Sequence, residues 1–562
     1  MSQTAATRYL TALAEHGVDS IFVNAGTDFA PIVEAYAANA KDGGAALPKP
    51  VLCAHENLAG GMAHGAALVT GRPQAVMLHV NVGTANVSCA VANAARDRVP
   101  LLITAGRSPI LEGGATGARD LPIHWSQEMF DQASLVREFV KWDYELRDAR
   151  QVDAVVDRAL SVATAHPRGP VYLALPREVL AEADGSNTGE RIRTAVPTAV
   201  HPDPDAVDQL ADRIAAADFP VIVATASGIE PESVGLLTRL AEQFAVGVAD
   251  PWHRYLNIAS NHPNRLGPDT LGVLKKADVI VFLESDVPWI DAHGSPQPDC
   301  FIAQVGVDPL YSAYPIRSHR SDLNIAATPT AFLARLTAAL NERAKSIDPA
   351  RAERIHAAAK AHHDAIAAIR TQETAPDSDA PITKNAISAV LGELLGEDDI
   401  VFNEYVATPC LLNRTQPGTY YFLPASGGLG WGLPAALGAK YAARDRTVVA
   451  TLGDGAYMFA NPAACHHAAA KHDLPVLTIL ANNCNWWAVD LATQLVYPDG
   501  RADAEDRFSN LSPSPEFAAY CAASGGYGVT VHKRSELKPA LEEALRVVRE
   551  EGRQALVDVR CV

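Results

Sequence analysis

The chain has 562 residues, of which 48% are hydrophobic, and a formal net charge of −18 at pH 7. A chain of this length is expected to form about three globular domains whose cores need no disulfides or structural metals. The negative charge argues against nucleic acid as a partner, because phosphate contacts need clustered Lys and Arg side chains.

Two further features concern the compartment. The chain has no run of about 18 apolar residues, and its N-terminus lacks the basic and apolar regions of a signal peptide, so no membrane partner is expected. The eight cysteines show no CxxC spacing, which is typical of buried free thiols in a reducing compartment. A cytoplasmic protein is therefore expected.

Residues 1–185 alternate predicted helices and strands. Helices are expected over 5–16 and 57–69, and strands over 20–23, 51–54, 75–80 and 101–105. The Gly-Thr-Ala-Asn sequence at 83–86 is expected to form a turn before the next helix. Such alternation predicts a doubly wound parallel sheet.

Two distant parts of the chain share one order of elements. Residues 61–67 (GMAHGAA) and 432–438 (GLPAALG) are each followed by an apolar strand, a glycine turn, an alanine-rich helical segment and a second strand. We infer two copies of one α/β domain, at 1–185 and 380–562. A duplication of this kind suggests a ligand site between the copies.

The middle of the chain is expected to form a third α/β domain over residues 195–340, with strands at 221–224 and 279–283. Residues 341–379 are polar and carry charges at helical spacing, which predicts a solvated linker helix and a loop. The predicted fold class is therefore α/β, with three doubly wound parallel-sheet domains.

Two strand ends in the C-terminal copy carry polar residues. One apolar run ends at Gly453-Asp454-Gly455, and the next ends at Asn482-Asn483. Because parallel strands deliver their carboxyl ends to one edge of a sheet, these residues should meet there. A carboxylate and an amide oxygen, beside glycines that admit a phosphate, suit a Mg²⁺ ion on a diphosphate.

These two motifs resemble the signature of enzymes that depend on thiamine diphosphate. The resemblance implies that Mg²⁺ is held by Asp454, the side chain of Asn483 and the backbone carbonyl of Asn485. It further implies a cofactor site made by Glu56, Thr408, Gly427, Leu429, Gly453, Asp454, Gly455, Ala456, Asn483 and Asn485.

Glu56 lies between a predicted strand and a helix of small residues, where this family has its catalytic glutamate. A carboxylic acid excluded from water has a raised pKa, so it can share a proton with the aminopyrimidine ring of the cofactor. By the same resemblance, the Gly427 carbonyl receives the aminopyrimidine, and Leu429 bends the cofactor. Thr408 is the hydroxyl that we assign to the diphosphate loop.

Within this family, five segments are most similar to the benzoylformate decarboxylases: 24–27 (NAGT), 78–86 (LHVNVGTAN), 135–145, 166–176 (HPRGPVYLALP) and 418–438. The resemblance implies that His79 and Thr27 face the substrate carboxylate and relay protons. Further residues are expected in the substrate pocket, namely Asn24, Trp486, Ala488 and Ala492.

Several functions remain open. The first is a decarboxylase or carboligase of 2-oxo acids, and the second is a 2-hydroxyacyl-CoA lyase, which the wide segment around Asp490 would suit. An acetolactate synthase-like enzyme carrying FAD is disfavoured, because residues 79–82 replace the Ser-Gly-Pro-Gly turn of that group. A fourth possible function is a non-catalytic nucleotide-binding module at 428–432, although this segment does not fit the GxGxxG motif.

The expected cofactors are thus thiamine diphosphate and Mg²⁺, without FAD. The expected partner is a small molecule, namely a 2-oxo acid, an aldehyde or an acyl-CoA. Self-association as a dimer or tetramer is also expected, because in this family the residues that match Glu56 and Asp454 meet across subunits.

Overall fold

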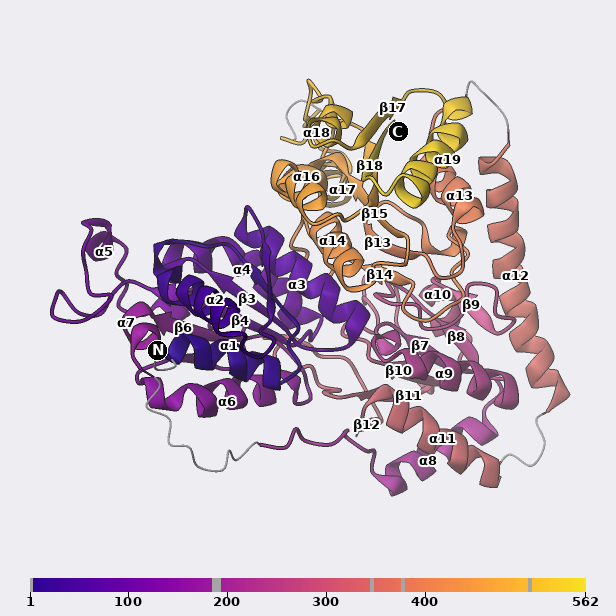
Figure 1. Ribbon diagram of the computed structural model, residues 1–562. Coiled ribbons are helices and arrows are strands. Elements are labelled where there is room, and N and C mark those ends of the chain that lie inside the picture. The colour runs from indigo at the N-terminus through magenta and orange to yellow at the C-terminus, as the bar shows by residue number, and fades with distance from the viewer. Residues whose placement is uncertain (1–3, 184–193, 344–347, 376–379, 504–507) are drawn as a thin grey trace. The chain divides into compact units, whose positions relative to one another are not determined.

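The computed structural model describes residues 4–183, 194–343, 348–375, 380–503 and 508–562. It contains three six-stranded sheets with flanking helices, and the strands of every sheet run parallel (Figure 1). The predicted α/β class with three parallel sheets is confirmed. The chain divides into two compact units, one of residues 1–197, 423–531 and 543–560, the other of 198–422, 532–542 and 561–562.

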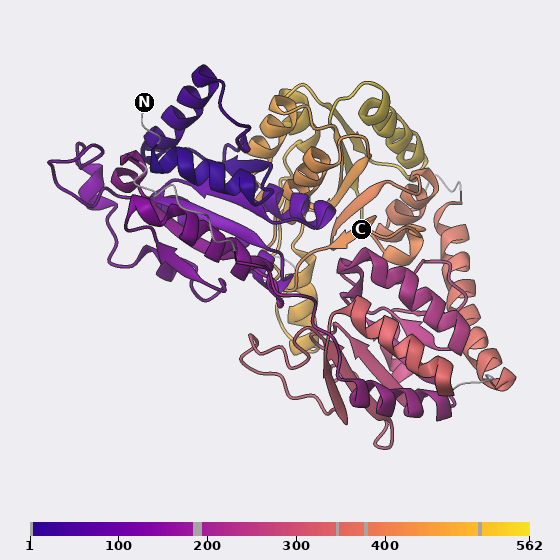
Figure 2. The same cartoon turned by 60° about the horizontal axis from the view of Figure 1, so that its bottom comes forward.

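The first sheet has the strand order β2-β1-β3-β4-β6-β5. Its strands are β1 (Ser20–Val23), β2 (Lys49–Leu52), β3 (Gln74–Leu78), β4 (Leu101–Arg107), β5 (Asp143–Glu145) and β6 (Val171–Pro176). The main helices are α1 (Ala5–Glu15), α2 (Ala30–Asp42), α3 (Glu56–Thr70), α4 (Val80–Arg96), α5 (Ile123–Ser126), α6 (Val152–Thr164) and α7 (Arg177–Ala181). Figures 1 and 2 show helices on both faces of this sheet, with α1 and α6 on one face and α3 and α4 on the other.

The turn predicted at 83–86 is wrong, because these residues lie inside α4. The helix begins at Val80, directly after β3 has ended at Leu78. A Cβ on Gly83 would lie 3.0 Å from that of Leu78, so glycine allows the first turn of α4 to lie close to the strand. The Thr84 hydroxyl donates to the Val80 carbonyl at 2.8 Å, which satisfies a polar side chain within the helix.

The third sheet has the order β14-β13-β15-β16-β18-β17. Its strands are β13 (Ile400–Glu404), β14 (Tyr420–Phe422), β15 (Val448–Gly453), β16 (Val476–Asn482), β17 (Tyr527–Val531) and β18 (Ala555–Arg560). Counted along the chain, both sheets have the order 2-1-3-4-6-5. This shared topology supports the prediction that the first and third domains have the same fold.

The helices of the C-terminal region are α13 (Lys384–Leu394), α14 (Gly432–Ala442), α15 (Asp454–Phe459), α16 (Pro462–Lys471), α17 (Trp487–Val496), α18 (Phe517–Ala523) and α19 (Arg534–Glu550). The alanine-rich segment after β15 consists of two helices. They are separated at Asn461, whose φ of 55° is left-handed, and Pro462 then begins α16. Asn tolerates this conformation better than most residues, and Pro suits the first helical position.

Two equivalent helices of the repeated fold, α3 and α14, pack directly on each other within the first unit. A Cβ on Gly65 would lie 1.9 Å from the Ala435 carbonyl oxygen, and a Cβ on Gly438 would lie 1.9 Å from the Met62 carbonyl oxygen. Glycine at these two positions therefore allows the two backbones to approach closely.

The central sheet has the order β12-β11-β10-β7-β8-β9. Its strands are β7 (Pro220–Ala224), β8 (Gly247–Ala249), β9 (Arg265–Gly267), β10 (Val279–Leu283), β11 (Phe301–Gly306) and β12 (Leu323–Ala326). Helices α8 (Pro204–Ala216), α9 (Pro231–Phe244) and α11 (Pro329–Arg343) pack on one face, and α10 (Thr270–Leu274) and α12 (Pro349–Glu373) pack on the other.

The predicted linker helix corresponds to α12. It is not solvated on all sides, because Ile355 and Ala359 are fully buried against the central sheet. Residues 344–347 and 376–379 of the predicted linker, and the predicted domain boundary at 185, lie outside the described residues. In the part of the chain that the structure describes, no helix is long and apolar enough to cross a membrane.

Candidate active site

The strand ends that carry the two C-terminal motifs meet at Asp454. Asp454 begins α15 directly after β15 and is buried, with an exposed fraction of 3%. The Gly455 N–H donates to its Oδ1 at 2.8 Å, and the backbone N–H groups of Cys484 and Asn485 also reach this carboxylate. The pKa of Asp454 is raised, because the effect of burial outweighs that of these backbone hydrogen bonds, which lower it.

Asn483 and Asn485 follow β16 and lie beside this carboxylate. The Asn485 N–H donates to the Asn483 side-chain oxygen at 3.2 Å, and the Asn485 amide nitrogen donates to Asp490 at 2.6 Å. The Asn485 Oδ1 is buried and has no hydrogen-bond partner. Since buried polar atoms are normally satisfied, an unpartnered oxygen beside a buried carboxylate fits a hard cation.

Of the three predicted metal ligands, Asp454, Asn483 and Asn485, only Asp454 has a carboxylate. Among the described residues, no cluster of three His, Cys, Asp or Glu side chains could hold a metal ion. A cation at Asp454 would therefore depend on amide and carbonyl oxygens and on oxygens from a bound diphosphate or from water. The residues present fit Mg²⁺ bound together with a diphosphate.

The three pocket residues predicted near α17 are all exposed, and one of them touches the Asp454 turn. A Cβ on Gly455 would lie 2.4 Å from the indole ring of Trp486, so this ring packs on the turn. Ala488 and Ala492 lie farther along α17. Trp486 is thus placed beside the candidate cation site.

Glu56 begins α3 and has an exposed fraction of 8%. Its carboxylate accepts a hydrogen bond from the Asn86 amide at 3.1 Å, and the His55 Nδ1 lies 3.8 Å away. Glu56 is thus largely excluded from water. Asn86 was not among the predicted site residues.

The glycine segment before α14 is held by Asn93 of α4. The Asn93 amide donates to the Gly428 carbonyl at 2.9 Å, and its oxygen accepts from the Gly428 N–H at 3.1 Å. Gly427 has a left-handed φ of 67°, and Leu429 is half-buried. Asn93 is itself buried and was also missed, although a polar residue on a buried helix face is a recognisable signal.

Thr408 belongs to the second unit. Its hydroxyl donates to the Asn385 side-chain oxygen at 2.7 Å, and its N–H donates to the Ser388 hydroxyl oxygen at 2.8 Å. Gly453 and Ala456, the remaining predicted cofactor residues, flank the Asp454 turn in the first unit.

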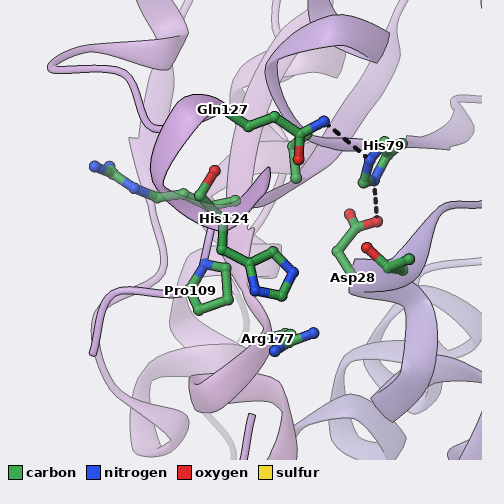
Figure 3. A pocket seen from close by; sticks show the side chains of 10 residues that line it. Asp28, His79, Pro109, His124, Gln127 and Arg177 are labelled. Atoms are coloured by element: carbon green, nitrogen blue, oxygen red, sulfur yellow. Dashed lines mark hydrogen bonds and ion pairs between the residues drawn. The ribbon is translucent and has the colours of Figure 1, made fainter. Parts of the chain in front are cut away.

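A small cavity of about 10 Å³ lies beside His79, which directly follows β3 (Figure 3). The cavity is lined by Thr27, Asp28, His79, Val80, Arg107, Ser108, Pro109, His124, Gln127 and Arg177. His79 Nδ1 lies 2.5 Å from Asp28 Oδ1, and its Nε2 lies 3.5 Å from the Gln127 amide nitrogen. This hydrogen bond with Asp28 raises the pKa of His79.

The other cationic groups around the cavity have partners of their own. Arg107 pairs with Glu128 and Glu145, and Arg177 pairs with Asp120. The pKa of His124 is lowered, mainly by burial, which favours its neutral form. The cavity is therefore polar, and His79 is the lining residue best suited to exchange a proton near neutral pH.

Comparison with known proteins bears on this arrangement. The chain matches the families described as the N-terminal and the C-terminal TPP binding domains of thiamine pyrophosphate enzymes, over residues 3–135 and 404–559. Together these matches cover just over half of the chain. The chain belongs to the thiamine diphosphate-dependent enzymes.

Several relatives of this thiamine diphosphate-dependent enzyme are similar over nearly their whole length. A benzoylformate decarboxylase from Pseudomonas aeruginosa is 27% identical, with 95% of each chain covered. A sulfoacetaldehyde acetyltransferase from Rhodobacter capsulatus is 25% identical, over 97% of this chain and 92% of the relative. The crystal structure of benzoylformate decarboxylase from Polynucleobacter necessarius shares the fold, with a TM-score of 0.81 at 21% identity over 100% of this chain and 99% of the other.

Two further residues that contact His79 in this thiamine diphosphate-dependent enzyme were not predicted from the sequence. Asp28 follows Thr27 directly, so its place after β1 was available as a signal. Gln127 follows α5, in a segment without a recognisable motif, and only folding brings it to His79. Asn24, by contrast, was predicted for the substrate pocket, and its amide donates to the Cys53 carbonyl at 2.8 Å.

Proposed function

We propose that this protein is a Mg²⁺-dependent decarboxylase or carboligase of 2-oxo acids, of the benzoylformate decarboxylase type. The observation that carries this proposal is His79, a partly exposed imidazole beside Thr27 at the carboxyl edge of the first sheet. The similarity to a benzoylformate decarboxylase over 95% of both chains supports it.

In this proposal, Asp454, the Asn483 side chain and the Asn485 backbone carbonyl would hold Mg²⁺ together with the diphosphate of the cofactor. Gly427 and Leu429 would hold the rest of the cofactor, and Glu56 would hydrogen-bond its ring nitrogen. Bound thiamine diphosphate supplies an electron sink for the carbanion that is left when a carboxylate departs as CO₂.

The residues of the chain then have separate tasks. Glu56, a buried acid that accepts a hydrogen bond from Asn86, would share a proton with the cofactor ring. His79 and the Thr27 hydroxyl face the substrate and move protons at the reacting carbon and oxygen. Trp486, Ala488 and Ala492 would bound the space for the acyl group, with Trp486 packed on the Asp454 turn.

A product screen tests the proposed function. Purified protein loaded with thiamine diphosphate and Mg²⁺ is incubated with benzoylformate, pyruvate, sulfoacetaldehyde and a 2-hydroxyacyl-CoA, and the products are identified by mass spectrometry. We expect CO₂ and an aldehyde, or a ligated hydroxyketone, from a 2-oxo acid. Release of an aldehyde and a formyl-CoA product, with no turnover of any 2-oxo acid, would instead identify a 2-hydroxyacyl-CoA lyase. Glu56→Gln serves as the inactive control.

We also propose that the active enzyme is a dimer or a tetramer whose sites use both copies of the repeated fold. Within one chain, His55 Nδ1 lies 3.5 Å from the Asn461 amide nitrogen, so the start of α3 touches the segment after α15. Mixing inactive Glu56→Gln and Asp454→Ala subunits tests which chains share a site. Restored activity is expected if Glu56 serves a neighbouring subunit, and a fully active monomer in light scattering would contradict the proposal.

A further inference from the structure

The His79 ring is held closely by the loop that follows β1. A Cβ on Gly26 would lie 2.1 Å from His79 Nδ1, so the backbone of this loop lies directly against the ring. Two residues farther on, Asp28 places Oδ1 at 2.5 Å from the same nitrogen. The ring nitrogen Nδ1 is thus enclosed by the loop, and Nε2 is left on the side of Gln127 (Figure 3).

The side chain of Asp28 is buried, and the fold leaves space for its carboxylate. Its exposed fraction is 3%, and a Cβ on Gly106 would lie 1.6 Å from its Oδ2. Glycine at this position in β4 therefore makes room for the carboxylate. The Oδ2 atom has no hydrogen-bond partner, so the hydrogen bond of this buried group goes to His79 through Oδ1. A buried carboxylate that is held this way is costly unless it pairs with a donor.

We propose that Asp28 is the positioning residue of His79: it keeps Nδ1 protonated and directs Nε2 toward the substrate side of the site. The inference rests on the proposed function, in which His79 moves protons. Because an ionised carboxylate only accepts hydrogen bonds, Nδ1 carries a proton in both charge states of the ring. The proton that His79 exchanges is therefore the one on Nε2, and the ring cannot present the other tautomer.

Gln127 suits both charge states of Nε2. A side-chain amide offers an NH₂ donor to a neutral Nε2 and, after a flip, an oxygen acceptor to a protonated one. Gln127 is half-buried and lies after α5, so it can follow the proton on His79 without a change in the strands.

Among the charged groups that face His79, Asp28 has the largest effect on the pKa of the imidazole. Asp28 is in direct contact, and Glu56 at the start of α3 adds a weaker attraction, whereas burial acts in the opposite direction. Across the cavity, Arg107 and Arg177 are paired with acidic side chains, and burial favours neutral His124. Loss of the Asp28 charge should therefore lower the pKa of His79 substantially.

The direct test is the titration of His79 in the cofactor-loaded enzyme. The protein is labelled with histidine carrying ¹³C at Cε1, and the His79 signal is assigned by its loss in His79→Gln. We expect Asp28→Asn to lower the pKa of His79 by about one unit or more, the usual effect of losing a contacting charge. Asp364→Asn, at an exposed position on α12, is the matched control and should leave the signal unchanged.

Turnover provides the second readout. For Asp28→Asn we expect kcat to fall about 10–100-fold, as when a partner that orients a functional imidazole is lost, with little change in KM. The pH profile of kcat should move in the same direction as the NMR titration. Gly106→Ala keeps every charge but displaces the carboxylate, so it should lower kcat as well, although its His79 should remain closer to the wild-type pKa.

Two results would overturn the inference. One is an unchanged His79 titration in a folded Asp28→Asn protein, with folding judged by thermal melting and cofactor binding. The other is an unchanged kcat in both Asp28→Asn and Gly106→Ala. Failure of the proposed function is distinguishable, because the NMR titration requires no substrate. If no 2-oxo acid is turned over, a shifted titration still supports the pairing of Asp28 and His79, and an unshifted one still refutes it.

Discussion

The carboxyl ends of β3 and β15 occupy equivalent places in two sheets of the same strand order, but they hold their polar side chains differently. After β3, His79 is held by another side chain, the carboxylate of Asp28. At the end of β15, Asp454 is held by backbone N–H groups, including that of Gly455. One fold thus supports both arrangements.

The difference suits two kinds of chemistry. A carboxylate fixed by backbone N–H groups keeps oxygen lone pairs for a cation, which is what Mg²⁺ needs. An imidazole fixed at Nδ1 by a carboxylate keeps Nε2 for proton exchange, which is what a proton relay needs. The β15 edge is therefore expected to bind the cofactor, and the β3 edge is expected to act on the substrate.

The largest expected effect comes from removing the carboxylate at β15. Asp454→Ala should lower turnover by at least about a thousandfold, because several kcal/mol of interaction with the cation are lost. It should also abolish the increase in melting temperature that thiamine diphosphate and Mg²⁺ cause by binding the folded state. Asp445→Ala, at an exposed position, is the control. Cofactor stabilisation that persists in EDTA would contradict a cation at this edge.

Glu56 and His79 test the division between cofactor and substrate chemistry. Glu56→Gln should slow the exchange of the cofactor C2 proton into D₂O by at least about a hundredfold, the typical contribution of a positioned acid. His79→Gln should leave this exchange within a few-fold of normal while lowering turnover strongly. Exchange is followed by NMR without substrate. Equal slowing in both variants would mean that the two edges do not have separate tasks.

The packing of the two copies should affect stability more than chemistry. Gly438→Ala places a Cβ against the Met62 carbonyl oxygen, so we expect a loss of about 1–3 kcal/mol in the free energy of unfolding. Gly113→Ala, where a Cβ would meet nothing within 4 Å, should have little effect. Urea unfolding measures both. A neutral Gly438→Ala variant would show that α3 and α14 can separate without cost.

The smallest effect concerns pH and the β3 edge. Since the folded-state pKa of His79 is raised, its stabilising contribution is complete below about pH 6.5, the unfolded value, and is lost as pH rises through the folded value. The difference in free energy of unfolding between wild type and His79→Gln should therefore be largest in acid, at about 1 kcal/mol or less for a partly exposed pair. Urea titrations between pH 5.5 and about 8.5 measure it. A difference that grows with pH would contradict a raised pKa of His79 in the folded state.

The sequence by itself predicted the α/β class, the repeated fold and the family. Apolar β-branched runs that alternate with helical segments have few other solutions, and strands such as β10 were predicted at their observed bounds. The Asp454 and Asn483 motifs were also recognisable, because each lies directly at the end of a strand. Local patterns suffice where a residue is positioned by its own strand.

Tertiary structure decided the helical state of residues 83–86, where Gly83 allows the first turn of α4 to lie close to Leu78. It also decided which side chains hold the site residues. Asp28 is 51 residues from His79, Asn86 is 30 residues from Glu56, and Asn93 is 335 residues from Gly428. A hydrogen bond between such residues depends on distances of a few tenths of an ångström, which only the packing of the sheets and helices determines.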